Sequence, residues 1–239
     1  MTDDKKVKPK KKKRKLKKEA TLVIGGLALL LLFVIISIII KKNMEFSFEK
    51  KISSPVITVN DNIVTLKDFS YYIAQVESKG DEMAKVYDEN HPTAYWNLYM
   101  NDTSSSGYVT DLARRAAIDF CVRDNIYALE AEKAGMELTK EELDDIKYDA
   151  EQFYYKVSIK GRENTHIDVL SIEKSMRVEQ LAYKYITYLA ENDEDGVLQS
   201  VVLKYDVGGM YYEALKNDYS IKIDNNILND VRFGFVTIN

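Results

Sequence analysis

The chain has 239 residues, of which 30% are charged and 46% hydrophobic, with a net charge of −4, so it can form one or two modest domains. One cysteine, Cys121, excludes an internal disulfide, and the two histidines, His91 and His166, leave little for a histidine-based metal centre. Three prolines and ten glycines argue against a β-rich or collagen-like chain.

The charge is divided sharply along the chain. Residues 1–20 carry 11 bases and 3 acids, residues 21–40 carry no charge, and residues 43–239 carry 21 bases and 35 acids, a net of −14. The small overall charge is therefore the sum of a basic N-terminal tail and an acidic body.

The uncharged residues 21–40 are expected to form a transmembrane helix. Twenty helical residues span about 30 Å, which is the thickness of the hydrocarbon core. A secretory signal peptide has a shorter apolar region and ends in small residues at a cleavage site, whereas KKNMEF follows this segment. The sequence thus predicts an uncleaved, single-pass anchor.

The flanking charges predict the orientation of this anchor. Eleven bases precede the segment and two, Lys41 and Lys42, follow it, and the side richer in Lys and Arg stays in the cytoplasm. We therefore expect a cytoplasmic tail at 1–20, a stalk at 41–54 and an extracytoplasmic domain at 55–239, on the cell membrane. The basic run also resembles a nuclear-import or nucleic-acid patch, but its place before the span favours a topological role and no nucleic-acid partner.

The body opens with a predicted hairpin and a helix. Val56–Val59 is a short β-branched run, residues 60–62 indicate a turn, and Ile63–Val64 returns as a second strand. Thr65 and Asp68 have the spacing of a capping box, which predicts a helix that runs through about Val76. Residues 80–108 look less regular, with a short helix after Pro92 and a loop at 101–107.

Two longer helices follow. Apolar residues at i, i+4 steps predict a helix over 110–134 that ends at Gly135. Thr139 and Glu142 form a second capping-box pattern. The helix after it carries an apolar seam for packing against a neighbour: Leu143, Ile146, Ala150, Phe153 and Val157.

The remaining pattern completes the expected fold. Thr165–Asp168 is a third capping-box pattern, opening a helix to about Ala190, and residues 197–219 look helical. Residues 220–224 alternate like a strand, residues 225–226 indicate a turn, and residues 233–238 are strand-like. We expect a mainly α body with a small β-sheet formed by N- and C-terminal strands.

No residue pattern points to catalysis, a metal or a cofactor. Cys121 lies on an apolar helix stripe, which favours a core thiol, and neither histidine has a partner at metal-ligand spacing. Residues 191–196 resemble the first half of a calcium loop, but Val202 occupies the position that requires a bidentate glutamate.

Tyrosine is abundant, with 17 residues and several adjacent aromatic pairs. One interpretation is a core with a half-buried rim, in which one member of each pair is less buried. The other is a surface that holds extended polypeptide through apolar contacts and hydroxyl hydrogen bonds. The candidate client-binding residues are Tyr95, Trp96, Tyr99, Tyr154 and Tyr211.

Two segments are similar to motifs of the SurA/PrsA family of extracytoplasmic foldases. The run from Val59 to Phe69 (VNDNIVTLKDF) resembles the entry hairpin and capped helix of the family, and LEAEKAGMELTKEE at 129–142 resembles its helix-turn-helix. Together they place the resemblance over roughly 55–190. The matching motif positions are Val59, Asn60, Thr65, Asp68, Phe69, Ala131, Gly135, Thr139 and Glu142.

The resemblance implies a SurA N-terminal-type chaperone domain without the catalytic module of the family. Asp61 replaces the usual turn glycine, which an aspartate tolerates by adopting a left-handed backbone. The stretch between Ala190 and Tyr211 is too short for the β-rich parvulin isomerase module. The implied protein is a holdase near the translocon that binds unfolded or partly folded exported proteins and is no enzyme. Two alternatives are a membrane-tethered module for one secretion or envelope partner, and a degenerate prolyl isomerase.

Overall fold

The computed structural model describes residues 31–32, 34–35, 48–101, 106–193 and 203–238. The chain divides into two compact units, Met1–Phe46 and Ser47–Asn239. The described residues of the first unit are helical and lie within the predicted membrane segment. The predicted tail, most of the predicted membrane helix and residues 41–47 of the predicted stalk lie outside the described residues. Among the residues that are described, no helix has the length and apolar character needed to cross a membrane.

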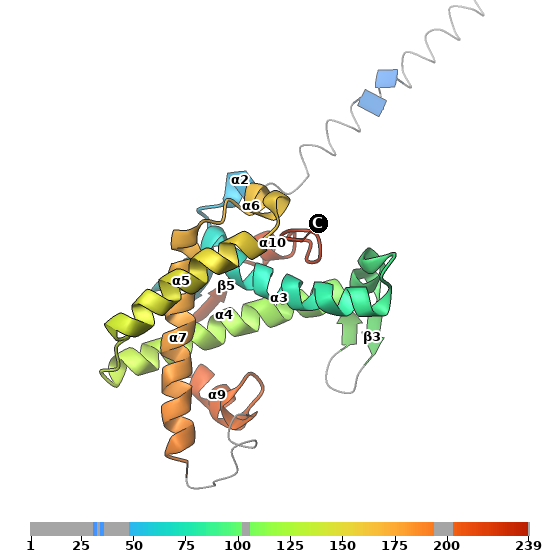
Figure 1. Cartoon of the computed structure of the whole chain (residues 1–239). Helices are drawn as coiled ribbons and strands as arrows, with labels where there is room; N and C mark the ends of the chain where they lie inside the picture. The colour runs from blue at the N-terminus through green and yellow to red at the C-terminus, as the bar shows by residue number, and fades with distance from the viewer. Residues whose placement is uncertain (1–30, 33, 36–47, 102–105, 194–202, 239) are drawn as a thin grey trace, which may run out of the picture. The chain divides into compact units, whose positions relative to one another are not determined.

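The second unit is mainly helical with a small antiparallel sheet (Figure 1), which confirms the expected fold class at this level. Its elements in chain order are α2 (Phe48–Lys51), β1 (Pro55–Val59), β2 (Asn62–Thr65), α3 (Leu66–Tyr87), η1 (Pro92–Asn97), β3 (Tyr99–Asn101), β4 (Ser106–Tyr108), α4 (Val109–Lys133), α5 (Lys140–Lys156), α6 (Ile159–Thr165), α7 (Val169–Glu191), α9 (Met210–Lys216), β5 (Ile221–Ile223) and α10 (Asn225–Leu228). Helix α2 falls within the predicted stalk and buries Phe48, so the folded body begins earlier than the sequence indicated.

Strand β1 is the centre of the three-stranded sheet, with the order β2-β1-β5. It pairs with β2 through a two-residue loop and with β5 on its other side, where Ile57 lies opposite Ile223. This confirms the predicted pairing of N- and C-terminal strands for residues 221–223. The left-handed residue of the loop is Asn60, with φ 52°, rather than Asp61. Its side chain also accepts a hydrogen bond from the N–H of Ser220 at 2.9 Å.

Helix α3 begins at the predicted capping box. The Thr65 hydroxyl accepts from the N–H of Asp68 at 3.2 Å, and the Asp68 carboxylate accepts from the N–H of Thr65. The helix buries Leu66, Phe69 and Ile73 completely. It continues to Tyr87, well beyond the expected end near Val76.

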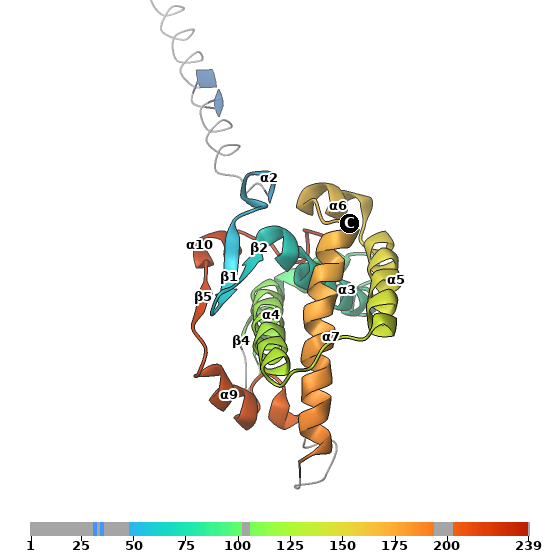
Figure 2. The same ribbon diagram turned by 90° about the vertical axis from the view of Figure 1, so that its left-hand side faces the viewer.

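Helices α4 and α7 cross at the centre of the unit, and α5 packs along α7 (Figures 1 and 2). The buried face of α4 includes Ala117 and Cys121, both fully buried. The predicted stop is confirmed, since Gly135 is left-handed with φ 71°. The predicted Thr139–Glu142 capping box is present as well.

The predicted box at Thr165–Asp168 is wrong. Thr165 ends the short helix α6, and its hydroxyl donates to the carbonyl of Gly161 at 2.8 Å. His166 has a left-handed backbone with φ 52°. It therefore lies in the turn that separates α6 from α7, not in the first turn of the predicted helix. Helix α7 is capped by Asp168 in a box with Ser171.

The region after α3 is more regular than expected. A 3₁₀ helix, η1, covers Pro92–Asn97, and the predicted helical residues Tyr99 and Met100 lie instead in β3. Strands β3 and β4 pair as a hairpin where a loop was expected, with Tyr99 opposite Tyr108.

The C-terminal segment also differs from the prediction. Residues 225–228 form α10, capped by Asp224, where a turn was expected. Residues 233–238 form turns and bends rather than a strand. Their N–H groups bind the buried carboxylate of Glu77 on α3, which replaces the pairing that a strand would provide. The described part of the predicted 197–219 helix contains a break at Gly208–Gly209 followed by α9.

Candidate functional site

The five aromatic residues predicted to contact a client lie in three separate places. Tyr95 and Trp96 on η1 are buried, with 7% and 2% of their surface exposed, whereas Tyr99 on β3 is 61% exposed. Tyr154 lies on α5, where Arg162 is 4.7 Å from its ring centre. Tyr211 lies on α9 and contacts Tyr205. Of the five, the exposed Tyr99 is best placed for a contact with another molecule.

Trp96 packs against two glycines, and both positions exclude a side chain. A Cβ atom on Gly80 would lie 2.3 Å from the indole, and one on Gly234 would lie 2.2 Å from it. Gly234 also has φ +89°, a conformation that favours glycine. Trp96 therefore packs against both α3 and the C-terminal segment.

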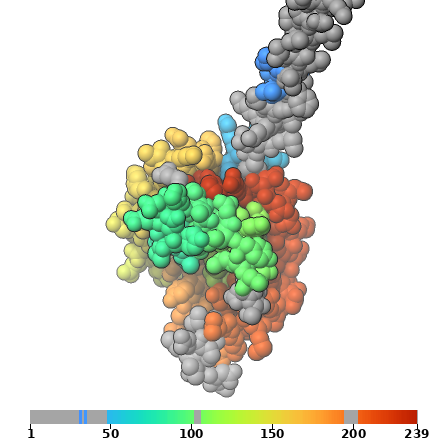
Figure 3. Space-filling model, turned by 90° about the vertical axis from the view of Figure 1, so that its right-hand side faces the viewer, coloured from blue at the N-terminus to red at the C-terminus, as the bar shows by residue number. Residues whose placement is uncertain are grey.

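Exposed apolar side chains lie at the end of α3 and on the β3–β4 hairpin, and we call this region the apolar tip. Figure 3 shows these segments, in green, gathered on one face of the molecule. Its side chains have between 42% and 89% of their surface exposed. The members of the apolar tip are Met83, Val86, Tyr87, Tyr99, Met100 and Tyr108.

The apolar tip rests on ordered contacts. The hydroxyl of Tyr95 donates to the sulfur of Met83 at 3.5 Å, and the rings of Tyr95 and Tyr87 are 6.1 Å apart. On the hairpin, the rings of Tyr99 and Tyr108 meet edge to face at 5.4 Å. The tip is therefore a pre-formed aromatic and sulfur-containing surface.

Sequence reasoning missed the α3 half of the tip. Met83, Val86 and Tyr87 have the i, i+3, i+4 spacing of one helix face, so the signal was present. It was overlooked because residues 80–108 were interpreted as irregular. A helix extended to Tyr87 would have revealed this apolar stripe.

A second feature is a pocket of about 200 Å³ between β2, α3, α4 and α7, which we call the polar pocket. Lys174 and Asp68 form an ion pair of 2.7 Å in its wall, with the lysine side chain 61% exposed. The hydroxyl of Ser175 lies 3.2 Å from the carbonyl oxygen of Asp68. The lining residues are Asn62, Ile63, Val64, Asp68, Tyr72, Asn125, Lys174, Ser175 and Val178.

Tyr72 is a buried residue in the wall of this pocket. Only 2% of the residue is exposed, and its hydroxyl interacts with the carboxylate of Asp124. Burial raises the pKa of Tyr72 well above its ordinary value, with the Asp124 charge acting in the same direction, so the phenol stays protonated. The adjacent Tyr71 is equally buried but donates to Glu179. The expectation that one member of each pair is less buried fails for this pair.

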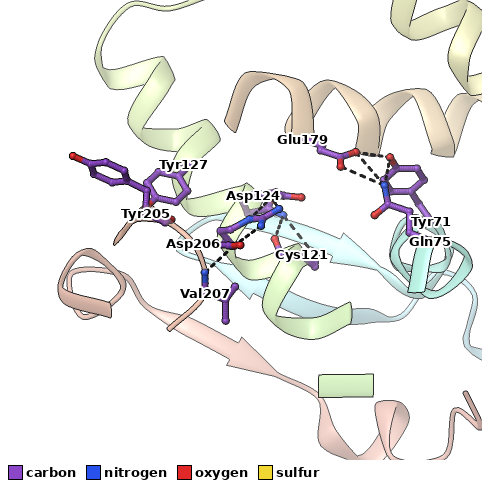
Figure 4. Close-up of polar contacts among 11 residues, drawn as sticks. Tyr71, Gln75, Cys121, Asp124, Tyr127, Glu179, Tyr205, Asp206 and Val207 are labelled. Atoms are coloured by element: carbon purple, nitrogen blue, oxygen red, sulfur yellow. Dashed lines mark hydrogen bonds and ion pairs between the residues drawn. The ribbon is translucent and has the colours of Figure 1, made fainter. Parts of the chain in front are cut away.

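Beside the pocket lies a partly buried polar network (Figure 4). Arg123 bonds Asp124 at 2.8 Å and Asp206 at 2.7 Å. Burial raises the pKa of Asp124 to about 7, although the charge of Arg123 opposes this shift. Tyr127 donates to the carbonyl of Tyr205 at 2.7 Å. The network fastens residues 205–206 to α4.

The cysteine and the two histidines considered in the sequence differ in burial. Cys121 is fully buried, as predicted, and burial raises the pKa of its thiol. His91 is exposed beside Asp88, and His166 is exposed at the end of α6. Within the described ranges, no group of three or more His, Cys, Asp and Glu side chains is arranged to hold a metal ion. Residues 194–196 of the calcium-like loop lie outside those ranges.

Several residues that match the SurA/PrsA motifs lie in the core or cap a helix. Val59, Phe69 and Ala131 are completely buried. Glu142 caps α5 and also accepts from the Lys184 ammonium at 2.9 Å, which ties α5 to α7. These residues therefore contribute to packing and to helix capping.

Comparison of the chain with protein-family models, with curated proteins and with solved structures finds no match.

Proposed function

We propose that this protein is a membrane-anchored, extracytoplasmic holdase that binds unfolded or partly folded exported polypeptides on its apolar tip. The observation that carries the proposal is the exposure of six large apolar side chains at the end of α3 and on the β3–β4 hairpin. Contiguous exposed apolar patches are typical of interaction sites, because monomeric proteins usually bury such side chains.

The chemistry of the tip suits clients of varied sequence. Met83 and Met100 are flexible and polarisable, so they adapt to different side chains. Tyr87, Tyr99 and Tyr108 combine an apolar ring with a hydroxyl that can bond the client main chain. The support beneath the tip limits the entropy lost on binding.

Charge and anchoring favour the same function. The net charge of −14 over residues 43–239 attracts basic segments. An anchor at residues 21–40 would keep the tip at high local concentration beside the translocon, where extended chains emerge. The similarity to the SurA/PrsA motifs supports a chaperone, and the missing parvulin module argues against isomerase activity.

The test is suppression of aggregation by the full chain in lipid nanodiscs, with several unrelated denatured proteins as clients. We expect Val86→Asp and Tyr99→Ser to reduce protection severalfold. Leu170→Asp and Tyr155→Ser are matched controls, because these side chains are similarly exposed outside the tip. Failure to protect any client at equimolar ratio would contradict the proposal.

Protection of one protein alone would instead support the alternative, a tethered module for a single partner. A prolyl-isomerisation assay with the same preparation addresses the other alternative. Activity well above background would overturn the negative expectation for isomerase function.

A further inference from the structure

Basic side chains gather where the second unit begins. Helix α2 opens this unit and contacts α6, and both ribbon views place the two helices side by side (Figures 1 and 2). Helix α5 ends just before α6 in the chain. We call the bases of α2, α6 and the last residue of α5, together with Ile159, the basic end. Its bases are Lys50, Lys51, Lys156, Lys160 and Arg162.

The basic end differs in charge from the rest of the body. Residues 43–239 carry 21 bases and 35 acids, whereas α2 and residues 156–165 together carry five bases and two acids, Glu49 and Glu163. The four lysines are exposed and Arg162 is half-buried. Within the described ranges, none of these five bases forms an ion pair. Their positive charge is therefore available to a partner outside the body.

An exposed apolar side chain accompanies these charges. Ile159 is the first residue of α6, and 69% of its surface is exposed. The helix beneath it is held by the C-terminal segment, because a Cβ on Gly161 would lie 2.6 Å from the Thr237 backbone and Asn164 donates to the carbonyl of Val236 at 3.3 Å. Lysines beside an exposed apolar residue suit a membrane surface, where ammonium groups meet phosphates and the apolar side chain meets the acyl boundary.

The covalent connection keeps this surface close to the predicted anchor. Only residues 41–47 separate the predicted membrane segment at 21–40 from α2. Eight peptide units reach about 28 Å when fully extended. Helix α2 therefore cannot move further than this from the end of the anchor, whatever direction the connection takes.

We propose that the basic end binds the headgroups of anionic lipids around the anchor, with Lys50, Lys51 and Lys160 at the lipid phosphates and Ile159 at the acyl boundary. Each lysine near an anionic surface adds attraction, and salt screens it. The same surface repels the acidic remainder of the body, so attraction and repulsion together orient the body on the bilayer. This inference rests on the proposed function, because it presupposes the anchor.

The test places a bimane label at position 159, through Ile159→Cys, in the full chain in nanodiscs. The native Cys121 is fully buried, so the label attaches to the introduced thiol. Nitroxide-labelled lipids quench a label that lies at the bilayer. We expect quenching to be at least about twofold stronger with about one third phosphatidylglycerol than with phosphatidylcholine alone. The difference should vanish in about 1 M NaCl, where the Debye length is about 3 Å.

A second label provides the positional control. Met210 is 84% exposed on α9, at the other end of the same unit (Figures 1 and 2). A label attached through Met210→Cys should show little quenching in either lipid composition. Equal quenching at positions 159 and 210, or quenching at position 159 that does not depend on anionic lipid, would overturn the inference.

Two triple variants test the role of the lysines. Reversal of the charge at three positions of the basic end should remove the lipid-dependent part of the quenching: Lys50→Glu, Lys51→Glu and Lys160→Glu. The matched control reverses three exposed lysines elsewhere, so it changes the net charge equally and should keep the quenching: Lys79→Glu, Lys140→Glu and Lys222→Glu. The same loss in both variants would show a general charge effect and overturn the inference.

Suppression of aggregation separates this outcome from the proposed function. The basic-end variant should still protect clients, because it leaves the apolar tip unchanged. Absent quenching in a chain that enters nanodiscs and protects clients would overturn this inference alone. A chain that does not enter nanodiscs would contradict the anchor, and with it both the inference and the proposed function.

Discussion

Glu77 connects α3 to the C-terminal segment, and its replacement is the sharpest test of how the fold is held together. The carboxylate is completely buried. It accepts from the N–H groups of Gly234 at 2.5 Å, Phe235 at 3.1 Å, Val236 at 3.1 Å and Thr237 at 2.6 Å, and from the Thr237 hydroxyl. Glu77→Ala removes the acceptor of all five donors.

The expected loss follows from comparing two responses. Leaving the three buried N–H groups, those of Gly234, Val236 and Thr237, unpaired costs about 1–3 kcal/mol each, or roughly 3–9 kcal/mol in total. Releasing the segment into water instead exposes chiefly Phe233 and Val236, at about 1.5–3 kcal/mol each. The variant should adopt the less costly of these two responses, which is release of the segment. Glu77→Ala should therefore lower the free energy of unfolding by roughly 3–6 kcal/mol and free the C-terminal segment.

The assay uses the single tryptophan of the chain, Trp96, which packs against Gly234. Urea unfolding of the full chain is followed by its fluorescence, and hydrogen exchange is followed at residues 234–237. Glu82→Ala, an exposed position on the same helix, should change stability by less than about 0.5 kcal/mol. A loss below about 1 kcal/mol for Glu77→Ala, with residues 234–237 still protected, would refute the reasoning.

Three further changes test the rest of the structure. Burial raises the pKa of Asp124 from 3.8 to about 7, so the folded state binds a proton that the unfolded state has lost, and stability falls as pH rises between these values. Asp124→Asn should flatten this part of the plot of urea midpoint against pH, and an unchanged slope would contradict the assignment. Gly234→Ala places a Cβ 2.2 Å from Trp96 and should lower the free energy of unfolding by more than about 2 kcal/mol. Gly135→Ala meets open space at φ +71°, so it should cost only about 1–2 kcal/mol of backbone strain. Equal melting temperatures for the two variants would exclude the steric argument. Thr139→Ala removes the α5 cap and should cost about 1 kcal/mol in thermal unfolding, and a neutral result would mean that packing against α7 alone holds the helix start.

Local signals in the sequence were reliable where the local chain decides the structure. The Thr65 and Thr139 caps and the Gly135 stop depend on neighbours within a few residues, and all three were predicted correctly. The Thr165 box failed because Asp168 and Ser171 offered a competing box three residues later. Two equally good caps cannot be ranked by spacing alone.

Long-range contacts explain the other differences. Residues 233–238 were predicted to be strand-like. Glu77, about 160 positions earlier in the chain, instead accepts hydrogen bonds from their N–H groups, so these groups need no partner strand. Trp96 was a candidate for client binding, yet it packs against Gly234, which is distant in the sequence. The residues of the apolar tip and the polar pocket come from several elements, so their proximity could not be predicted without the tertiary structure.

Site-specific photocrosslinking tests the central claim most directly, by asking whether the apolar tip contacts an unfolded polypeptide. A benzoylphenylalanine is placed at Val86, which is 89% exposed on the tip, and in a control at Leu170, which is 74% exposed on α7. Each full-length variant in nanodiscs is irradiated with a denatured client. Crosslinks that form at position 86 and not at position 170, and that disappear when the client is native, are the predicted result. Equal crosslinking at both positions, or none at position 86, would contradict the account.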